Sequence, residues 1–301
     1  GLEKYNIMKK KLIVSGCSFT DKNFYSQSEP NYDCSFTKWP ELLAEKLDMD
    51  CINLGACGSG NHYIYSTLIE EIIRTPKEEI GLVIAAWSQV QRDDFQKYGK
   101  FTPRVFSYRD NYNKDMIWRN KRTGKEGNIF YWMLDHLRRI VSFDSLCKSH
   151  NIPYRQVQML SPFNAWLGGL MKTDFEIYRN QNNPDFVKRY KYEPTIVPTL
   201  KEIDEWFKPH KVNDYHFAMK DRKWLLEKVY DYEKYIDIEN FIGWPMEEQL
   251  GGYALEEKVL MYYNEEKNQV NDLDLIIGGF DFHPNGKGHQ KIAEYIHGQL
   301  V

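Results

Sequence analysis

The sequence of 301 residues lacks the signals that identify several large classes of protein. No apolar run approaches the ~18 residues that a membrane span needs, and neither a GxGxxG dinucleotide turn nor a P-loop occurs. The five cysteines are odd in number, and their spacing fits neither a zinc site nor a CxxC redox motif. We therefore expect free thiols in a reducing, cytoplasmic compartment, and no membrane association, metal or cofactor. The polar stretch from Gly1 to Lys11 also predicts no secretory leader.

An excess of charge of one sign is also missing. Forty Lys and Arg face 43 Asp and Glu, which gives a formal net charge of -3. This balance excludes a generally basic nucleic-acid coat protein, and no nucleic-acid-binding motif occurs, so a nucleic-acid partner is not expected. What is abundant is aromatic side chains, at 15% of the residues. That content suits a surface that stacks on sugars or bases as well as a core.

Short apolar runs alternate with helical patterns along the chain. Unbroken apolar runs are typical of strands covered on both faces, and apolar residues three and four apart indicate helices. The predicted strands are Lys11–Ser15, Cys51–Leu54, Leu82–Trp87 and Pro153–Met159, and the predicted helices are Trp39–Leu47, Asn61–Ile73 with Asn61 as its cap, Ile129–Val141 and Ile292–Leu300. This alternation predicts a parallel α/β sheet.

The predicted domain organisation is one domain over residues 1–301. Two stretches, near 95–128 and 161–235, break the alternation and are predicted to be long insertions at one end of the sheet. In an open parallel sheet, the loops after the carboxyl ends of the strands build the ligand site. The insertions are therefore expected beside that site.

Residues suited to acyl transfer follow the first two predicted strands. Ser18 comes directly after the first strand, where a turn presents a hydroxyl outward. The glycine-rich turn Gly55–Asn61 follows the second strand, and there Gly58 can offer a backbone N–H and Asn61 a side-chain amide to a developing oxyanion. Taken singly, each feature is also common as a helix cap or a tight turn.

Two further segments carry polar side chains to the same predicted edge. Ser88 and Gln89 follow the third strand, and Arg92 lies close behind them as a possible partner of a carboxylate. Asp281 and His283 stand immediately before the last predicted helix. A histidine held by a loop, with an aspartate two residues away, suits a general base with its orienting acid.

In this order, the four segments resemble the SGNH, or GDSL-like, hydrolase family. The resemblance covers residues 10–95, 127–160 and 236–301. It implies a three-layer, flavodoxin-like parallel sheet of five strands with helices on both faces. It also implies that Ser18 is the nucleophile and His283 the base, with Asp281 as the orienting acid, and that the N–H groups of Ser18 and Gly58 form the oxyanion hole.

Two positions depart from the family's pattern. The third segment reads Trp87-Ser88-Gln89 where the family has an Asn donor, so Ser88, Gln89 or Asn61 is expected to replace it in the oxyanion hole. The acid stands two residues before the histidine rather than three.

The preferred function is a serine esterase that removes acetyl or other short acyl groups from a carbohydrate. The alternative is a non-catalytic carbohydrate-binding or assembly module on the same scaffold.

The first insertion has a local excess of positive charge. Nine basic and three acidic residues lie between Gln96 and Glu126, with six aromatic residues among them. One interpretation is a solvated loop that its aromatic residues fasten to the core. The other is a surface that binds an anionic glycan ester. The side chains expected to contact substrate are Trp87, Arg92, Arg119 and Arg122.

Overall fold

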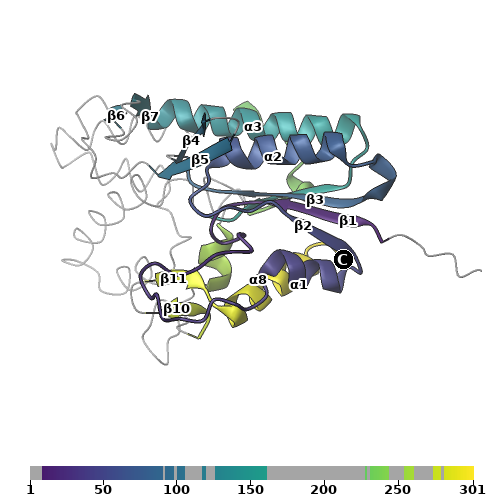
Figure 1. Cartoon of the computed structure of the whole chain (residues 1–301). Coiled ribbons are helices and arrows are strands. Elements are labelled where there is room, and N and C mark those ends of the chain that lie inside the picture. Colours follow the sequence, from purple (N-terminus) through teal and green to yellow (C-terminus); the bar gives the residue numbers. More distant parts are fainter. Residues whose placement is uncertain are drawn as a thin grey trace, which may run out of the picture.

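A central parallel sheet organises the molecule (Figure 1). The structure is a computed structural model that describes residues 9–90, 92–97, 100–105, 117–119, 126–160, 228, 231–243, 254–260, 274–278 and 281–301. The sheet has the strand order β2-β1-β3-β8-β9. Its strands are β1 (Lys11–Ser15), β2 (Asp50–Asn53), β3 (Ile80–Trp87), β8 (Tyr154–Gln158) and β9 (Phe241–Ile242).

All neighbouring strands of this sheet run parallel. The register sets Ile13 of β1 beside Ile52 of β2 and Val83 of β3. Because both faces of the sheet are covered, β3 is buried along nearly its whole length, as its unbroken apolar sequence predicts. The predicted flavodoxin-like α/β fold is therefore confirmed.

Helices cover both faces of the sheet. Helices α2 and α3 lie on one face, and α1 and α8 lie on the other (Figure 1). The bounds of the helices are α1 (Trp39–Lys46), α2 (Asn61–Arg74), α3 (Ile129–Ser149) and α8 (Gly286–Gly298). Shorter turns of helix are η1 (Lys77–Glu79), η2 (Ile238–Asn240) and the π-helical η4 (Glu256–Leu260).

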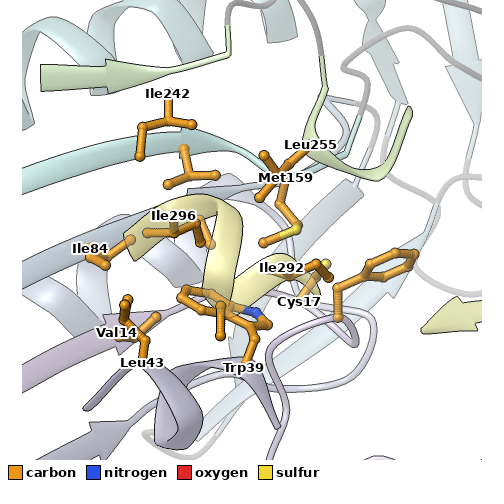
Figure 2. Packing of buried hydrophobic residues seen from close by; sticks show 14 of the residues in the cluster. Val14, Cys17, Trp39, Leu43, Ile84, Met159, Ile242, Leu255, Ile292 and Ile296 are labelled. Atoms are coloured by element: carbon orange, nitrogen blue, oxygen red, sulfur yellow. The ribbon is translucent and has the colours of Figure 1, made fainter. Parts of the chain in front are cut away.

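Each face of the sheet has its own hydrophobic core. On the α1/α8 face, Trp39 and Leu43 pack in one cluster with Ile292, Ile296 and Val14 (Figure 2). A hydrogen bond from the Trp39 N–H to the buried Nδ1 of His289 (3.1 Å) also joins the start of α1 to α8. This packing fixes the helix that begins just after His283.

Within the described ranges, three pairs of short antiparallel strands lie outside the main sheet. They are β4 (Arg92–Lys97) with β5 (Lys100–Val105), β6 (Ile117–Arg119) with β7 (Glu126–Asn128), and β10 (Ile276–Gly278) with β11 (Asp281–Pro284). The first insertion, predicted as a loop, thus contains paired strands. The prediction missed them because pairing outside the main sheet leaves no buried apolar run in the sequence.

The second insertion, at 161–235, lies outside the described residues except for 228 and 231–235. The organisation of 1–301 as one domain stays a prediction. Among the described helices, none combines the length and the apolar character that crossing a bilayer requires.

Candidate active site

Ser18 lies in the tight turn that follows β1. The carbonyl of Cys17 accepts hydrogen bonds from the N–H groups of Thr20 and Asp21 (2.8 and 3.0 Å), which closes this turn. Cys17 is buried in the core, and Ser18 is itself only 4% exposed. The end of β1 and the closed turn therefore hold the Ser18 hydroxyl at one place on the carboxyl edge of the sheet.

Asp281 and His283 belong to β11, and not to a loop as the sequence predicted. Side chains two residues apart on a strand point to the same side. The exposed Phe282 between them points to the other side. This alternation lets an acid two residues before the histidine reach its ring, although the family's spacing is three.

The three side chains form a continuous hydrogen-bonded chain. The Nε2 atom of His283 lies 2.8 Å from the Oγ of Ser18, and its Nδ1 atom lies 2.6 Å from Oδ1 of Asp281. The same carboxylate oxygen accepts the His283 backbone N–H at 2.9 Å. The rings of Phe19 and Phe24 pack on the imidazole, with centroids 5.0 and 4.4 Å away. The structure thus brings together the three residues expected to carry catalysis, in the geometry of a nucleophile, a base and an orienting acid.

The electrostatics keep the base neutral and the acid charged. Burial lowers the pKa of His283 below its usual value, and the adjacent Asp281 opposes that shift only in part. Burial opposes ionisation of Asp281, but hydrogen bonds from Ser26 and His283 outweigh it and lower the pKa of this carboxyl. At neutral pH, therefore, Nε2 of His283 is free to accept the Ser18 proton.

Ser26 completes this chain, and the sequence analysis missed it. Its hydroxyl donates to Oδ2 of Asp281 and accepts the N–H of Glu29 at 2.9 Å. Because 255 positions separate Ser26 from Asp281 along the chain, no local sequence motif indicates the contact. Ser26 is buried and fixes the second oxygen of the acid.

The glycine-rich turn after β2 is tied to the turn that carries Ser18. The Ser59 hydroxyl donates to the carbonyls of Gly16 and Ala56 (2.8 and 2.6 Å), and Asp21 accepts the N–H of Cys57 at 2.8 Å. Gly58 has a φ of 76°, a conformation that favours glycine. Among the described residues, no hydrogen bond uses the N–H of Ser18 or of Gly58. Both groups are thus available to a ligand.

Asn61 joins the second turn to the third, instead of capping α2 as predicted. Its Oδ1 accepts the Ser88 N–H at 2.7 Å and its Nδ2 donates to the Ser88 carbonyl at 3.1 Å. The N-cap residue of α2 is Gly60, which has no side chain to form a capping hydrogen bond. The Ser88 hydroxyl is buried and has no partner among the described residues, and Oε1 of Gln89 accepts from Arg92 at 3.3 Å. The roles of Asn61, Ser88 and Gln89 in an oxyanion hole stay predictions.

The structure places the four residues that were expected to contact substrate in different environments. Trp87 is fully buried and its indole N–H donates to Gln156 at 2.9 Å, so it belongs to the core, which corrects the prediction. Arg92 donates to the Ser59 carbonyl at 3.1 Å, and thus to the protein itself. Arg122 lies outside the described residues, as does the side chain of Arg119, whose backbone ends β6.

Within the described ranges, His, Cys, Asp and Glu side chains form no group of three that could hold a metal ion. Separately, the described site offers a hydroxyl, an imidazole, a carboxylate and backbone N–H groups. That set is sufficient for nucleophilic attack on an acyl carbon and for stabilising the resulting oxyanion.

Comparisons with known proteins add little to this geometry. No family model matches the chain, and no curated protein matches it. A solved structure assigned to the G-D-S-L family of lipolytic proteins, from Desulfitobacterium hafniense DCB-2, matches with a TM-score of 0.41 and 14% identity. The match covers 97% of this chain and 100% of that one. At this TM-score the likeness lends no weight to a function, and the resemblance to SGNH hydrolases rests on the segments and contacts described above.

Proposed function

We propose that this protein is a serine ester hydrolase of the SGNH type. One observation carries the proposal: the unbroken chain of contacts from Ser18 Oγ through the His283 ring to the Asp281 carboxylate. A buried charged acid bonded to a neutral imidazole, which is bonded to a hydroxyl, is an arrangement suited to covalent catalysis.

The reaction follows from these contacts. His283 takes the proton of Ser18 as the hydroxyl oxygen attacks the acyl carbon, and the N–H groups of Ser18 and Gly58 stabilise the oxyanion. His283 then gives its proton to the leaving alcohol, and an acyl-enzyme remains on Ser18. Water, deprotonated by His283, then attacks that ester, and His283 returns the proton to the Ser18 oxygen as the acid is released. Asp281 stabilises the imidazolium that forms in each step.

The proposal extends to a short acyl ester of a carbohydrate. Its support is the aromatic content of the chain and two exposed aromatic side chains in the segment that follows Ser18. Tyr25 is 66% exposed and Tyr32 is 40% exposed. Exposed aromatic rings of this kind are able to stack on sugar faces.

The test compares the rate of p-nitrophenyl acetate hydrolysis by the wild type and by Ser18→Ala. A matched control is Ser35→Ala, which removes an exposed hydroxyl from the same segment. We expect Ser18→Ala to fall to the background rate and Ser35→Ala to match the wild type. Equal background release by wild type and Ser18→Ala would instead favour the non-catalytic carbohydrate-binding module. Acetate release from an acetylated polysaccharide, compared with release from a long-chain ester, then tests the substrate class.

A further inference from the structure

The peptide group between Ser59 and Gly60 is held at both of its polar atoms by β4. Its carbonyl, on Ser59, accepts from Nη1 of Arg92 at 3.1 Å. Its N–H, on Gly60, donates to Oδ1 of Asp94 at 2.7 Å. Arg92 and Asp94 are two residues apart on the strand, so their side chains lie on one face. One face of β4 therefore fixes the orientation of this peptide.

The approach of β4 to the turn is close. A Cβ atom on Gly60 would lie 2.7 Å from the Arg92 carbonyl oxygen and 2.8 Å from Oδ2 of Asp94. The second oxygen of Asp94 also accepts the Tyr63 N–H at 2.8 Å, in the first turn of α2. Asp94 is 8% exposed, and its bond from the Gly60 N–H is buried. The start of α2 and the turn before it are thus held by the same carboxylate.

The proposed oxyanion donor, the Gly58 N–H, belongs to the Cys57–Gly58 peptide, two peptide groups before the one that β4 holds. The Cys57 N–H before it donates to Asp21 at 2.8 Å, and the Ser59 N–H after it donates to the Ala56 carbonyl at 3.2 Å, so fixing the Ser59–Gly60 peptide limits the rotation of the peptide that carries this donor. An oxyanion donor is effective only when its direction is set before the reaction. Arg92 also places a positive charge near His283, which contributes to lowering the pKa of that ring.

We propose that Arg92 and Asp94 are positioning residues of this active site, which hold the Ser59–Gly60 peptide so that the Gly58 N–H points at the oxyanion. The inference rests on the proposed esterase function. It gives β4, the strand that follows the third segment, a part in the chemistry at Ser18. In this chain β4 holds the glycine-rich turn in place. The segment after β3, where the SGNH family has an Asn donor, has none here.

The experiment measures kcat and KM for p-nitrophenyl acetate in Asp94→Asn and Arg92→Gln. The matched controls are Asp135→Asn and Arg139→Gln, an ion pair on α3 that lines the same ~210 Å³ cavity as Arg92 and Asp94 but has no bond to the turn. Because a misdirected donor loses interactions made only in the transition state, we expect each test variant to lower kcat by about 10- to 100-fold with KM nearly unchanged. Both controls should stay within about twofold of the wild type in both constants.

The pH profile gives a second readout that a purely structural role would not move. Removing the charge of Arg92 should raise the pKa of His283, so the acid limb of kcat/KM should move to higher pH in Arg92→Gln and stay in place in Arg139→Gln. If Asp94→Asn fails to fold, Asp94→Glu and Arg92→Gln carry the test. If the wild type turns over and kcat is unchanged in Arg92→Gln and Asp94→Asn, the inference is overturned and the proposed function stands. Equal losses of kcat in the two control variants would have the same meaning. No turnover by the wild type above Ser18→Ala would overturn the proposed function and the inference with it.

Discussion

Asp281 is the residue on which most contacts of the site converge. Its carboxylate accepts from the Ser26 hydroxyl, from the His283 backbone N–H and from the His283 ring. Three donors around one buried carboxylate fix both its charge and its direction. The imidazole is consequently held from the side away from Ser18, and Nε2 is left for the nucleophile.

We expect Asp281→Asn to be nearly as damaging as the loss of His283. An amide in place of the carboxylate would not stabilise the imidazolium and would favour the wrong tautomer, so kcat should fall by roughly 10³- to 10⁴-fold. The measurement is the kcat of p-nitrophenyl acetate hydrolysis, with Asp274→Asn, before β10, as a control for the same chemical change. A loss of less than about tenfold would show that the acid does not orient this base.

Ser26→Ala should have a milder effect of the same kind. It removes one of three donors and leaves the other two, so we expect kcat to fall by about 3- to 30-fold. Loss of the donor also raises the pKa of Asp281, since that hydrogen bond favours the charged form. The acid limb of kcat/KM, which the pKa of His283 sets, should stay in place, so the effect is measured as the fall in kcat at neutral pH. A kcat equal to that of the wild type would contradict this role for Ser26.

The sequence revealed Ser18, Asp281 and His283 because each stands in a short motif beside a strand or a helix. It did not reveal Ser26 or Asp94. Their partners are 255 and 34 positions away along the chain, and the contacts depend on how loops are folded back onto the sheet edge. Pairwise contacts of this kind leave no periodic signal in one sequence.

At the scale of elements, the unusual feature is a helix capped from a distant strand. The N-cap Gly60 offers no side chain to α2, and Asp94 of β4 supplies the acceptor instead. A carboxylate at a helix N-terminus is favoured by the helix dipole, yet this one is buried. Burial raises its pKa to about 6, in spite of the hydrogen bonds from Tyr63 and Gly60.

The sign of the resulting pH dependence follows from that shift. The pKa of Asp94 is about 6 in the folded protein and near 3.8 in the unfolded chain, so the folded state binds the proton more tightly. The contribution to stability is thus fully present below pH 3.8 and is lost as the pH rises to about 6. The loss is about 3 kcal/mol at most, from a shift of about two units.

Urea unfolding at several pH values measures this effect. Relative to Asp94→Asn, the free energy of unfolding of the wild type should fall between about pH 4 and pH 6. Asp135→Asn serves as the control and should show the same slope as the wild type. Parallel curves for the wild type and Asp94→Asn would contradict a raised pKa. At neutral pH the Asp94 carboxylate is ionised, and the folded protein is then less stable than with Asp94 protonated. Functional sites commonly lower the stability of a fold in this way.

Most elements of the main fold were predictable from the sequence. Because they are buried on both faces, β1 and β3 read as unbroken apolar runs, and the helices read as apolar stripes because each has one face on the sheet. The fifth strand, β9, has only two residues, too few for any pattern. β11 was read as a loop because its alternation extends over four residues only. Short elements that tertiary contacts hold in place are the part of the fold that periodicity does not detect.

At the scale of the whole molecule, the triad joins the two ends of the described chain. Ser18 follows the first strand and His283 precedes the last helix, and 265 positions separate the two residues. Between them in the sequence lie the other described strands of the main sheet, β2, β3, β8 and β9, and the helices α1, α2 and α3 (Figure 1). The hydroxyl is therefore an activated nucleophile only when both ends of the chain have been brought to one edge of the sheet.

A covalent probe of this nucleophile should consequently report the integrity of the whole fold. A fluorophosphonate reacts with an activated serine and much more slowly with an ordinary one. In a urea titration, we expect the labelled fraction to fall in the same transition as the tryptophan fluorescence, to which the buried Trp39 and Trp87 contribute. Labelling that is lost well before the fluorescence change would show that the site opens separately. If the two transitions coincide, each labelled molecule is one in which the chain has closed from its first strand to its last helix, so labelling counts folded molecules in a mixture.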